Sequence, residues 1–339
     1  MLDSLLAKGI LPDLVIRAGI KRLIAQRLRD DIATTVERAE QQRLALVDEL
    51  KNSPIAIETD KANDQHYQVP TDFFLYSLGK NLKYSCCHWD KAKNLDEAED
   101  EMLALTIERA QIKDGQDILE LGCGWGSITF ALAKANPNGR VTAVSNSKTQ
   151  KDFIISKAQR LGIRNIEVIT CDVNFLEVEQ KFDRVVSVEM FEHVRNYSKL
   201  LEKISGWLKD DGKLFVHIFT HRTTAYKFEV KDSTDWMSKY FFSGGIMPSE
   251  HLFYYFQDHL KVQRHWVEPG VHYAKTARAW LDKMDENKEQ IIQIFKGHYG
   301  PGESEKWFQY WRIFYMACEE LWAYRGGTEW TVTHYLWSK

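Results

Sequence analysis

The sequence predicts a doubly wound α/β fold, in which helices cover both faces of a parallel sheet. Two observations lead to this fold class. From Gly115 onward, short apolar segments typical of buried strands alternate with helical stretches. A glycine-rich turn also joins the first such strand to its helix. The chain has 339 residues, of which 44% are hydrophobic and 27% charged, so it is long enough to bury a large core.

Residues 1–70 are expected to form an N-terminal helical segment and a linker. Apolar residues recur at helical spacing over residues 14–28, with several basic residues, Arg17 among them, on the rest of the helix. A basic amphipathic helix can lie on an anionic membrane surface. The favoured interpretation is a lid packed on the main domain with its basic residues in solvent. A second helical pattern covers residues 32–50, and residues 52–70 are polar and turn-rich.

Residues 71–220 are the predicted core of the fold. Five strands are expected there, at 117–121, 140–145, 166–171, 184–188 and 214–219. The helical stretches between them lie near 127–135, 149–161 and 198–208. Because helices alternate with these strands, the strands are expected to run parallel. Open α/β sheets bind their ligands at the carboxyl ends of such strands.

The last third of the chain is rich in aromatic residues. Of the 42 Trp, Tyr and Phe residues, 24 lie between Trp236 and Trp337. Residues 221–259 are aromatic and irregular, and we expect them to form a substrate cap over the ligand edge of the sheet. Residues 260–339 are expected to complete the core, with strands at 261–267 and 329–337 and helical stretches near 275–295 and 304–324.

The composition excludes several classes of protein. A formal net charge of −3 argues against a general nucleic-acid partner. The five cysteines include the adjacent Cys86 and Cys87, which favours a reduced, cytoplasmic setting over a disulfide framework. The first residues lack the pattern of a signal peptide, and no uncharged apolar run reaches the length of a membrane span. The protein is therefore expected in the cytoplasm, with attachment to a membrane surface through the basic helix as the alternative.

The turn after the first predicted strand carries a G-x-G-x-G motif, Gly122-Cys123-Gly124-Trp125-Gly126. Glycines let the backbone turn tightly and approach a ligand closely. The spacing differs from the dinucleotide motif G-x-G-x-x-G, and no Walker lysine follows, so a phosphate cradle is not favoured. Glu120 stands two residues before the first glycine. This arrangement is the pattern of S-adenosylmethionine-dependent methyltransferases, and a purely structural turn is the alternative.

The ends of the next two strands supply hydrogen-bonding groups. After the second strand there is no carboxylate, but Asn146 and Gln150 can bond ribose hydroxyls as neutral groups. After the third strand, Asp172 can accept from an adenine amino group and the backbone N–H of Val173 can donate to the ring. Asp172 as an ordinary turn or cap residue is the alternative.

The fourth strand is followed by two carboxylates and an imidazole, Glu189-Met190-Phe191-Glu192-His193. Such a group is costly to bury without a purpose. At the mouth of a sheet whose other loops hold a cofactor, it predicts a catalytic site. A histidine held by a carboxylate is a suitable general base.

Residues 66–339 resemble the coclaurine N-methyltransferase group, within the wider superfamily of cyclopropane-fatty-acid synthases and mycolic acid methyltransferases. The resemblance implies a Rossmann-like sheet of seven strands. It rests on a series of short motifs: His66-Tyr67, Val69-Pro70, Lys83-Tyr84-Ser85-Cys86-Cys87, Gly122-Cys123-Gly124, Asn146-Ser147, Gln150-Lys151, Val188-Glu189-Met190-Phe191-Glu192-His193, Tyr240-Phe241-Phe242, Tyr255-Phe256-Gln257-Asp258, His265-Trp266 and Glu329-Trp330.

The resemblance also implies roles for individual residues. The S-adenosylmethionine site would be lined by Tyr84, Ser85, Gly122, Gly124, Asn146, Gln150, Asp172 and Val173. The acid and base cluster of the alkaloid enzymes would be Glu189, Glu192 and His193. Cys86, Glu192, His217 and Tyr273 match in residue type the cluster that holds bicarbonate in the cyclopropane synthases. Those synthases, however, have a glycine in place of Glu189 and a sizeable N-terminal membrane-associating domain.

Two chemistries follow from the resemblance, and the amine is favoured. In amine methylation, His193, oriented by Glu192 or Glu189, would accept a proton from a small amine, while aromatic rings surround the cationic product. We expect Phe241, Phe256 and Tyr273 to be among those rings. In the alternative, a cyclopropane-synthase-type reaction would modify an unsaturated lipid with the help of bicarbonate. A non-catalytic S-adenosylmethionine-binding protein is a minor alternative. No metal is expected, S-adenosylhomocysteine would be the product of the cofactor, and the aromatic C-terminal helices could form a homodimer.

Overall fold

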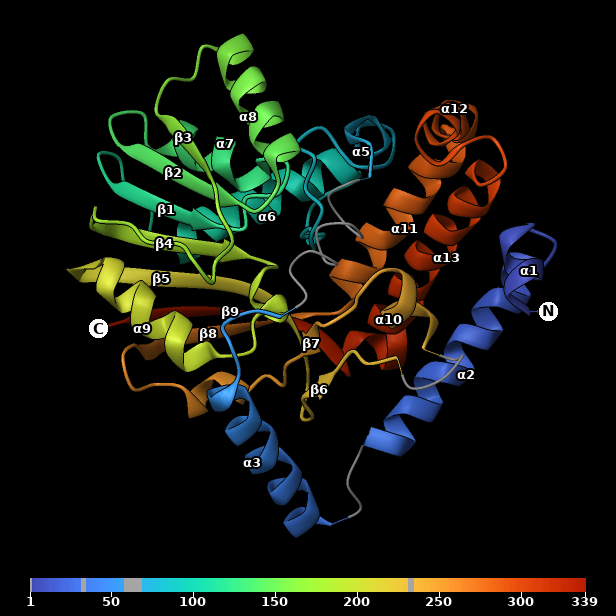
Figure 1. The fold of residues 1–339 in the computed structure, drawn as a ribbon, viewed down its shortest axis with the longest axis horizontal. Helices are drawn as coiled ribbons and strands as arrows, with labels where there is room; N and C mark the ends of the chain where they lie inside the picture. The colour runs from blue at the N-terminus through green and yellow to red at the C-terminus, as the bar shows by residue number, and fades with distance from the viewer. Residues whose placement is uncertain (1, 32–34, 58–68, 231–234) are drawn as a thin grey trace.

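A seven-stranded sheet forms the centre of the computed structural model, which describes residues 2–31, 35–57, 69–230 and 235–339. The strand order is β3-β2-β1-β4-β5-β9-β8 (Figure 1). The strands are β1 (Asp117–Leu121), β2 (Arg140–Ser145), β3 (Ile166–Thr170), β4 (Phe182–Val188), β5 (Leu208–His221), β8 (Lys261–Pro269) and β9 (Trp330–Ser338). The helices around this sheet complete the predicted fold class, which is confirmed.

The five strands predicted for the core run parallel as expected, and the last strand runs the other way. β1 to β5 pair in parallel, whereas β9 pairs antiparallel with both β5 and β8. The chain before β9 returns at the carboxyl end of β5, where Trp330 pairs with His221. The final strand must therefore run back along β5 to fill its place in the sheet.

Side chains alternate between the two faces of the sheet, as expected for strands covered on both sides. In β1, Leu119 and Leu121 pack with α3 (Val36–Asn52) and α9 (Tyr197–Trp207). Ile118 points the other way, toward α6 (Leu95–Arg109) and α7 (Ser127–Ala135). A further helix, α8 (Lys148–Leu161), packs beside β2 and β3. Helix α6 was not predicted from the sequence.

A second helical body stands beside the sheet and contains most of the late aromatic residues (Figure 1). Its members are α1 (Leu2–Ala7), α2 (Asp13–Asp31), α5 (Thr71–Ser77), α10 (Trp236–Tyr240), α11 (Val271–Glu286), α12 (Lys288–Tyr299) and α13 (Ser304–Ala323). Trp280 and Trp311 are 1% and 0% exposed within it. Most of the rings in the last third thus form the core of this body.

The helical stretch predicted near 275–295 is divided into α11 and α12. Asn287 stands at the break, with φ −107° and ψ 24°. Its side-chain amide donates to the carbonyl of Lys283 at 2.8 Å and to that of Tyr76 at 3.3 Å. An asparagine that bonds nearby carbonyls offers the backbone an alternative to continuing the helix, which explains the end of α11.

The cap region contains a small hairpin and two short helices. β6 (Tyr226–Lys227) pairs with β7 (Ile246–Met247), and α10 lies between them in the chain. The single-turn helix η2 (Leu252–Tyr255) also belongs to this region, whereas η3 (Tyr324–Gly327) lies between α13 and β9. A third, η1 (Phe191–His193), directly follows β4. It carries Glu192 and His193 of the predicted acid and base cluster, and Glu189 lies in the turn between β4 and η1.

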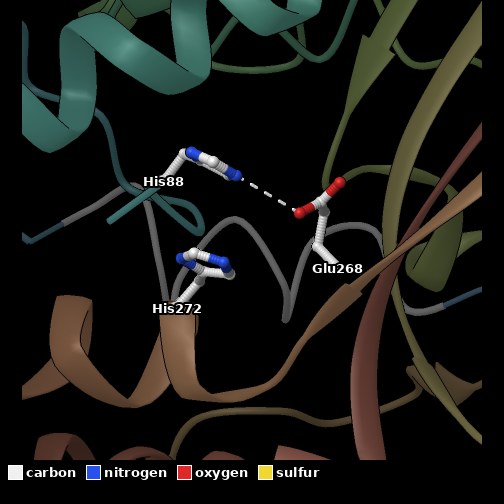
Figure 2. Close-up of side chains that lie close together, drawn as sticks. All are labelled: His88, Glu268 and His272. Carbon is white, nitrogen blue, oxygen red and sulfur yellow. Dashed lines mark ion pairs between the residues drawn. The ribbon is translucent and has the colours of Figure 1, made fainter. Parts of the chain in front are cut away.

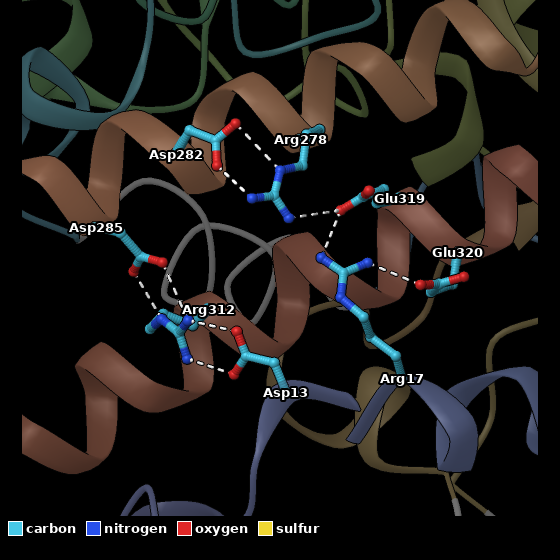
Figure 3. A network of polar contacts seen from close by, with 8 residues as sticks. All are labelled: Asp13, Arg17, Arg278, Asp282, Asp285, Arg312, Glu319 and Glu320. Carbon is cyan, nitrogen blue, oxygen red and sulfur yellow. Dashed lines mark hydrogen bonds and ion pairs between the residues drawn. The ribbon is translucent and has the colours of Figure 1, made fainter. Parts of the chain in front are cut away.

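Helix α2 packs on α13, within the second helical body, through ion pairs (Figure 3). Arg17 bonds Glu319 and Glu320 of α13, both at 2.7 Å, and Asp13 bonds Arg312 at 2.8 Å. Helix α2 thus packs on α13, and the expectation that its basic residues face solvent is wrong for Arg17, because α13 presents acids to it. Its role as a lid stays a prediction. Over the parts of the chain that the structure describes, no helix is long and apolar enough to cross a bilayer.

Candidate active site

The glycine loop after β1 forms the floor of a cavity. Gly122, Gly124 and Gly126 all have positive φ, of 81°, 50° and 83°. A Cβ on Gly122 would lie 2.7 Å from the Cβ of Met190, so only glycine fits there. A Cβ on Gly124, in contrast, would meet nothing within 4 Å. The backbone is therefore open to a ligand at Gly124.

Two hollows meet at this loop and share Gly122, Gly124 and Gln150. The first encloses about 710 Å³, including the solvent at its mouth, and is lined by the ends of β1, β2 and β3. Its lining includes Asn146, Asp172, Val173 and His193. The second is lined by Lys83, Tyr84, Ser85 and Glu189, among others. All eight residues predicted to hold the cofactor thus line one continuous space.

The side chain of Gln150 is held with one hydrogen-bonding group unused. Its Oε1 accepts from Ser145 Oγ at 2.7 Å, whereas its buried Nε2 has no partner among the described residues. An unpaired buried donor is costly, so this amide suits a ligand with an acceptor. Asp172 serves both interpretations made for it, because it lines the hollow and its Oδ1 accepts from the N–H of Asn174 at 2.7 Å, as in a turn.

A segment assigned to the linker also lines the first hollow. Ala56 and Ile57 lie against it, although nothing in their sequence suggested a binding role. Asn174 fixes this segment by accepting from the N–H of Ala56 at 3.0 Å and donating to its carbonyl at 3.2 Å. His66 and Tyr67, which belong to the family motifs, lie outside the described residues.

Glu189 stands at the end of β4 in a conformation that few residues adopt. Its φ is +46°, in the left-handed region, which costs a non-glycine residue about 1–2 kcal/mol. This turn brings the carboxylate into a closed niche between β5 and α11. Its Oε1 accepts from the Cys86 N–H at 2.9 Å and faces His217 Nε2 at 3.3 Å, and its Oε2 accepts from the Tyr273 hydroxyl at 2.6 Å.

The two glutamates differ in their surroundings. Burial raises the pKa of Glu189, but the Lys83 ammonium, the Cys86 N–H and the Tyr273 hydroxyl oppose this shift. Burial raises the pKa of Glu192 well above its usual value, and the charge of Glu189 raises it further. Oε2 of Glu192 is buried with no hydrogen-bond partner in the described part of the chain. Glu189 is therefore the more acidic member of the pair, and Glu192 keeps its proton to higher pH.

His193 is neutral at physiological pH. Burial lowers its pKa to about 4, the positive charge of Arg195 acts in the same direction, and the charge of Glu189 opposes them. Its ring stacks on Phe242, with centroids 5.0 Å apart and an interplanar angle of 20°. The lone pair of the imidazole is thus available to accept a proton.

A row of aromatic rings connects His193 to the niche of Glu189. Phe242 lies 5.7 Å from Phe219, which lies 5.7 Å from Trp322. Trp322 stacks on Tyr273 with centroids 4.7 Å apart and an angle of 8°. Phe242, Phe219 and Trp322 were not predicted as site residues. The family motif Tyr240-Phe241-Phe242 contained the signal, but it could not show which ring faces the site.

Two predicted aromatic residues lie elsewhere. Phe241 stacks on Phe314 of α13 at 4.5 Å and is 1% exposed, in the core of the helical body. Phe256 packs edge-to-face on Tyr197 at 5.3 Å, in the core on the α9 face of the sheet. Tyr273 alone of the three contacts the acid and base cluster, through Glu189.

Residues 56–327 match the model of the mycolic acid cyclopropane synthetase family. This match covers well over half of the chain. The chain belongs to that family. Within the family, it is 40% identical to an (S)-coclaurine N-methyltransferase from Thalictrum flavum subsp. glaucum over 336 residues, which are 98% of this chain and 93% of that protein. It is 27% identical to the cyclopropane-fatty-acyl-phospholipid synthase of Escherichia coli (strain K12), over 80% of this chain and 65% of that protein.

Solved structures of family members agree with this assignment. The crystal structure of a coclaurine N-methyltransferase bound to N-methylheliamine and SAH superposes with a TM-score of 0.96 and 38% identity, covering 100% of this chain and 99% of that one. The cyclopropane synthase MmaA2 from Mycobacterium tuberculosis shares the fold, with a TM-score of 0.69, 19% identity, and coverage of 83% and 98%. The protein is an S-adenosylmethionine-dependent methyltransferase, as the sequence predicted.

Proposed function

We propose that this enzyme transfers a methyl group from S-adenosylmethionine to the nitrogen of a small amine with an apolar or aromatic body. The observation that carries the proposal is the Glu189 carboxylate, buried at the end of a row of aromatic rings. A buried anion beside rings suits a cationic amine. The most similar relatives named above are amine N-methyltransferases.

The residues around the two hollows fit S-adenosylmethionine. The unused Nε2 of Gln150 would donate to a ribose hydroxyl, together with Asn146. Asp172 and Val173 would hold the adenine, and Gly124 leaves room for the ligand. Tyr84 and Ser85 would contact the methionine part in the second hollow. When bound, the cofactor supplies an electrophilic methyl group on a sulfonium.

The niche of Glu189 favours the amine over the lipid alternative. The resemblance connected Cys86, His217 and Tyr273 with bicarbonate. In the structure, the Cys86 N–H, the His217 Nε2 and the Tyr273 hydroxyl all face the Glu189 carboxylate. The side chain thus occupies the place where a free bicarbonate would lie, and it supplies the same kind of anion. A cyclopropane-type reaction that depends on bound bicarbonate is disfavoured for this reason.

The acid and base residues can prepare an amine for methylation. A bound ammonium must lose a proton before its lone pair can attack a methyl group. Neutral His193 would accept this proton. The burial that lowers the pKa of His193 also lowers the pKa of an ammonium bound beside it, because both lose their hydration. Glu189 would hold the cationic product in place, and the ring faces of Phe242 and Trp322 would stabilise it.

Labelled S-adenosylmethionine tests the proposal. The enzyme is incubated with S-adenosylmethionine carrying a labelled methyl group, an aromatic secondary amine and vesicles of unsaturated phospholipid, and the products are separated. We expect label in the amine fraction. Label in extracted phospholipid alone would overturn the amine proposal, and cofactor binding without transfer to either acceptor would favour a non-catalytic binding protein.

Two finer predictions concern assembly and location. A homodimer through the C-terminal helices stays a prediction. The rings of Trp280 and Trp311 in these helices are buried in the core of the chain itself and do not reach the surface. Sedimentation of the purified protein tests it. Cytoplasmic location, with or without attachment to a membrane surface, also stays a prediction, and fractionation of cells tests it.

A further inference from the structure

A continuous line of buried polar groups leads away from Glu189 through the sheet. His217 of β5 and His334 of β9 stand directly opposite each other, and both are 0% exposed. His217 Nδ1 and His334 Nε2 lie 2.8 Å apart. On the far side, Arg109 of α6 lies with its Nη1 2.8 Å from His334 Nδ1. The groups therefore follow in the order Arg109, His334, His217, Glu189.

The direction of every hydrogen bond in this line is fixed by Arg109. A guanidinium only donates, so His334 Nδ1 must accept. A neutral imidazole carries one N–H, so His334 donates from Nε2 to His217 Nδ1, and His217 donates from Nε2 to Glu189 Oε1. Burial lowers the pKa of both histidines well below the usual value, which keeps both rings neutral. Since an arginine keeps its protons, the line orients hydrogen bonds and does not conduct protons.

The outer end of the line is anchored near the surface (Figure 2). Arg109 Nη2 bonds Glu268 at 2.7 Å, and its guanidinium lies 5.1 Å above the ring of Trp266. Glu268 also faces His88 Nε2 at 3.3 Å, and the His88 ring stacks on His272 (Figure 2).

His88, Glu268 and His272 could be taken for a metal site, because their ligand atoms lie within 4.8 Å of one another. His272 Nδ1, however, accepts from the Trp89 N–H at 2.9 Å, which places the ring proton on Nε2. No lone pair of His272 is then left for a metal. The cluster serves instead to hold Glu268, and through it Arg109.

We propose that His334 is a positioning residue for the methyl transfer, which it supports by fixing the tautomer of His217 that donates to Glu189. This inference rests on the proposed function, in which Glu189 acts as an anion. With the opposite tautomer, a lone pair of His217 would face the carboxylate and repel it. Other groups act on Glu189 as well and are unchanged by substitution at position 334: Lys83, Cys86, Glu192, His193, Tyr273 and Cys318. His88, Arg109 and Lys83 act on the histidine pair.

Two substitutions at one position test the proposal. In His334→Gln the amide keeps one acceptor for Arg109 and one donor for His217, whereas His334→Phe keeps neither. We expect the acidic limb of kcat against pH to move upward by about one unit in His334→Phe, because His217 Nδ1 loses its donor and the tautomer that donates to the charged form of Glu189 is no longer enforced. His334→Gln should stay close to the parent enzyme. Binding of S-adenosylhomocysteine, measured by calorimetry, should be unchanged in both.

The outcomes separate this inference from the proposed function. An unshifted profile in His334→Phe, or equal shifts in both variants, would overturn the positioning role. If His334→Phe does not fold, the ¹⁵N spectrum of histidine-labelled parent enzyme decides: protonated Nε2 on His217 supports the proposal, and protonated Nδ1 overturns it. Glu189→Gln is the parallel test of the proposed function. Full amine methylation by that variant would overturn the role of Glu189, whereas loss of turnover with an unshifted His334→Phe profile would overturn the inference alone.

Discussion

The cofactor half and the acceptor half of the site are built in different ways. Around the cofactor hollow, each side chain follows the end of a strand and lies close in sequence to the turn that positions it, as with Gly122, Asn146 and Asp172. In the acceptor half, Glu189 meets Cys86, His217 and Tyr273 from distant parts of the chain. The first half is specified by local turns, the second by the packing of the helical body on the sheet.

This difference separates two kinds of energetic cost. In the cofactor half, the residues with left-handed backbone conformations are glycines, so these conformations carry little strain. In the acceptor half, Glu189 takes a similar conformation as a non-glycine residue and is buried. Strain and burial at one carboxylate are kept only where they serve a purpose, and the two halves should therefore respond differently to substitution.

The largest expected effect is a loss of turnover on substitution of His193, which lies between the two halves of the site. His193→Ala should lower kcat by about 10³-fold, the range of a lost general base. Because the pKa of His193 is about 4 and a simple ammonium keeps its proton up to about pH 10, kcat/KM of the parent enzyme should stay level from pH 6 to 8, with no inflection near 6.5. Steady-state kinetics measure both, and Kd for S-adenosylhomocysteine should be unchanged. An undiminished kcat would exclude His193 as the base.

The next effect concerns the stability of the cofactor half. Glu120 is buried and accepts from Thr129 Oγ1 at 2.6 Å, and burial raises its pKa to about 8. Between about pH 4.5 and pH 8 the folded state thus keeps a proton that the unfolded state has released. In this range the group lowers the free energy of unfolding by about 1.4 kcal/mol for each unit that the pH rises.

Glu120→Gln removes this dependence. We expect the variant to gain several degrees in Tm over the parent at pH 8, and less at pH 5, in thermal unfolding followed by circular dichroism. Its KM for the amine should not change, since the residue lies outside the acceptor half. A gain at pH 5 equal to that at pH 8 would show that Glu120 is ionised in the folded protein.

A smaller effect is expected in the ring row of the acceptor half. Phe242→Leu keeps apolar volume but removes the ring face beside His193, and should raise KM for the amine about tenfold. Phe241→Leu, at the neighbouring position in the core, is the matched control and should lower stability more than it raises KM. The same KM change in both variants would mean that Phe242 is ordinary core.

The smallest effect is expected far from both halves, at the contact of α2 with α13. Arg17→Gln should lower the free energy of unfolding by about 1 kcal/mol, because the pairs with Glu319 and Glu320 are only partly shielded from solvent. Arg22→Gln, at an exposed position of the same helix, should have no effect. Urea titration measures both, and equal values would show that the ion pairs of Arg17 add nothing.

The sequence predicted the strands and turns of the proposed cofactor half because its signals are local. The strands at 117–121 and 140–145 have the predicted bounds, and all eight predicted cofactor residues line one space. The last strand was predicted at 329–337, but its antiparallel direction was not, because periodicity reports that a strand exists and not its direction. The break at Asn287 was missed although residues 285–290 are all polar and interrupt the apolar spacing between Met284 and Ile291.

The acceptor half was only partly predictable. A family motif contains Glu189, and Tyr273 matches the bicarbonate cluster in residue type, but Phe242, Phe219 and Trp322 come together through contacts between distant segments. Phe241 was preferred to Phe242 although they are neighbours in sequence, and a short irregular segment has no period that tells which ring faces inward. The same holds for His334, which only the register of β5 and β9 brings to His217.

The most direct test of the central claim, that Glu189 supplies the anion of the acceptor site, is the variant Glu189→Gly. Glycine accepts the φ of +46° without strain, so the fold and the binding of S-adenosylhomocysteine should persist. We predict that amine methylation falls by at least about 100-fold and is partly restored by millimolar bicarbonate or formate, neither of which should affect the parent enzyme. Undiminished methylation by Glu189→Gly without added anion would contradict the claim.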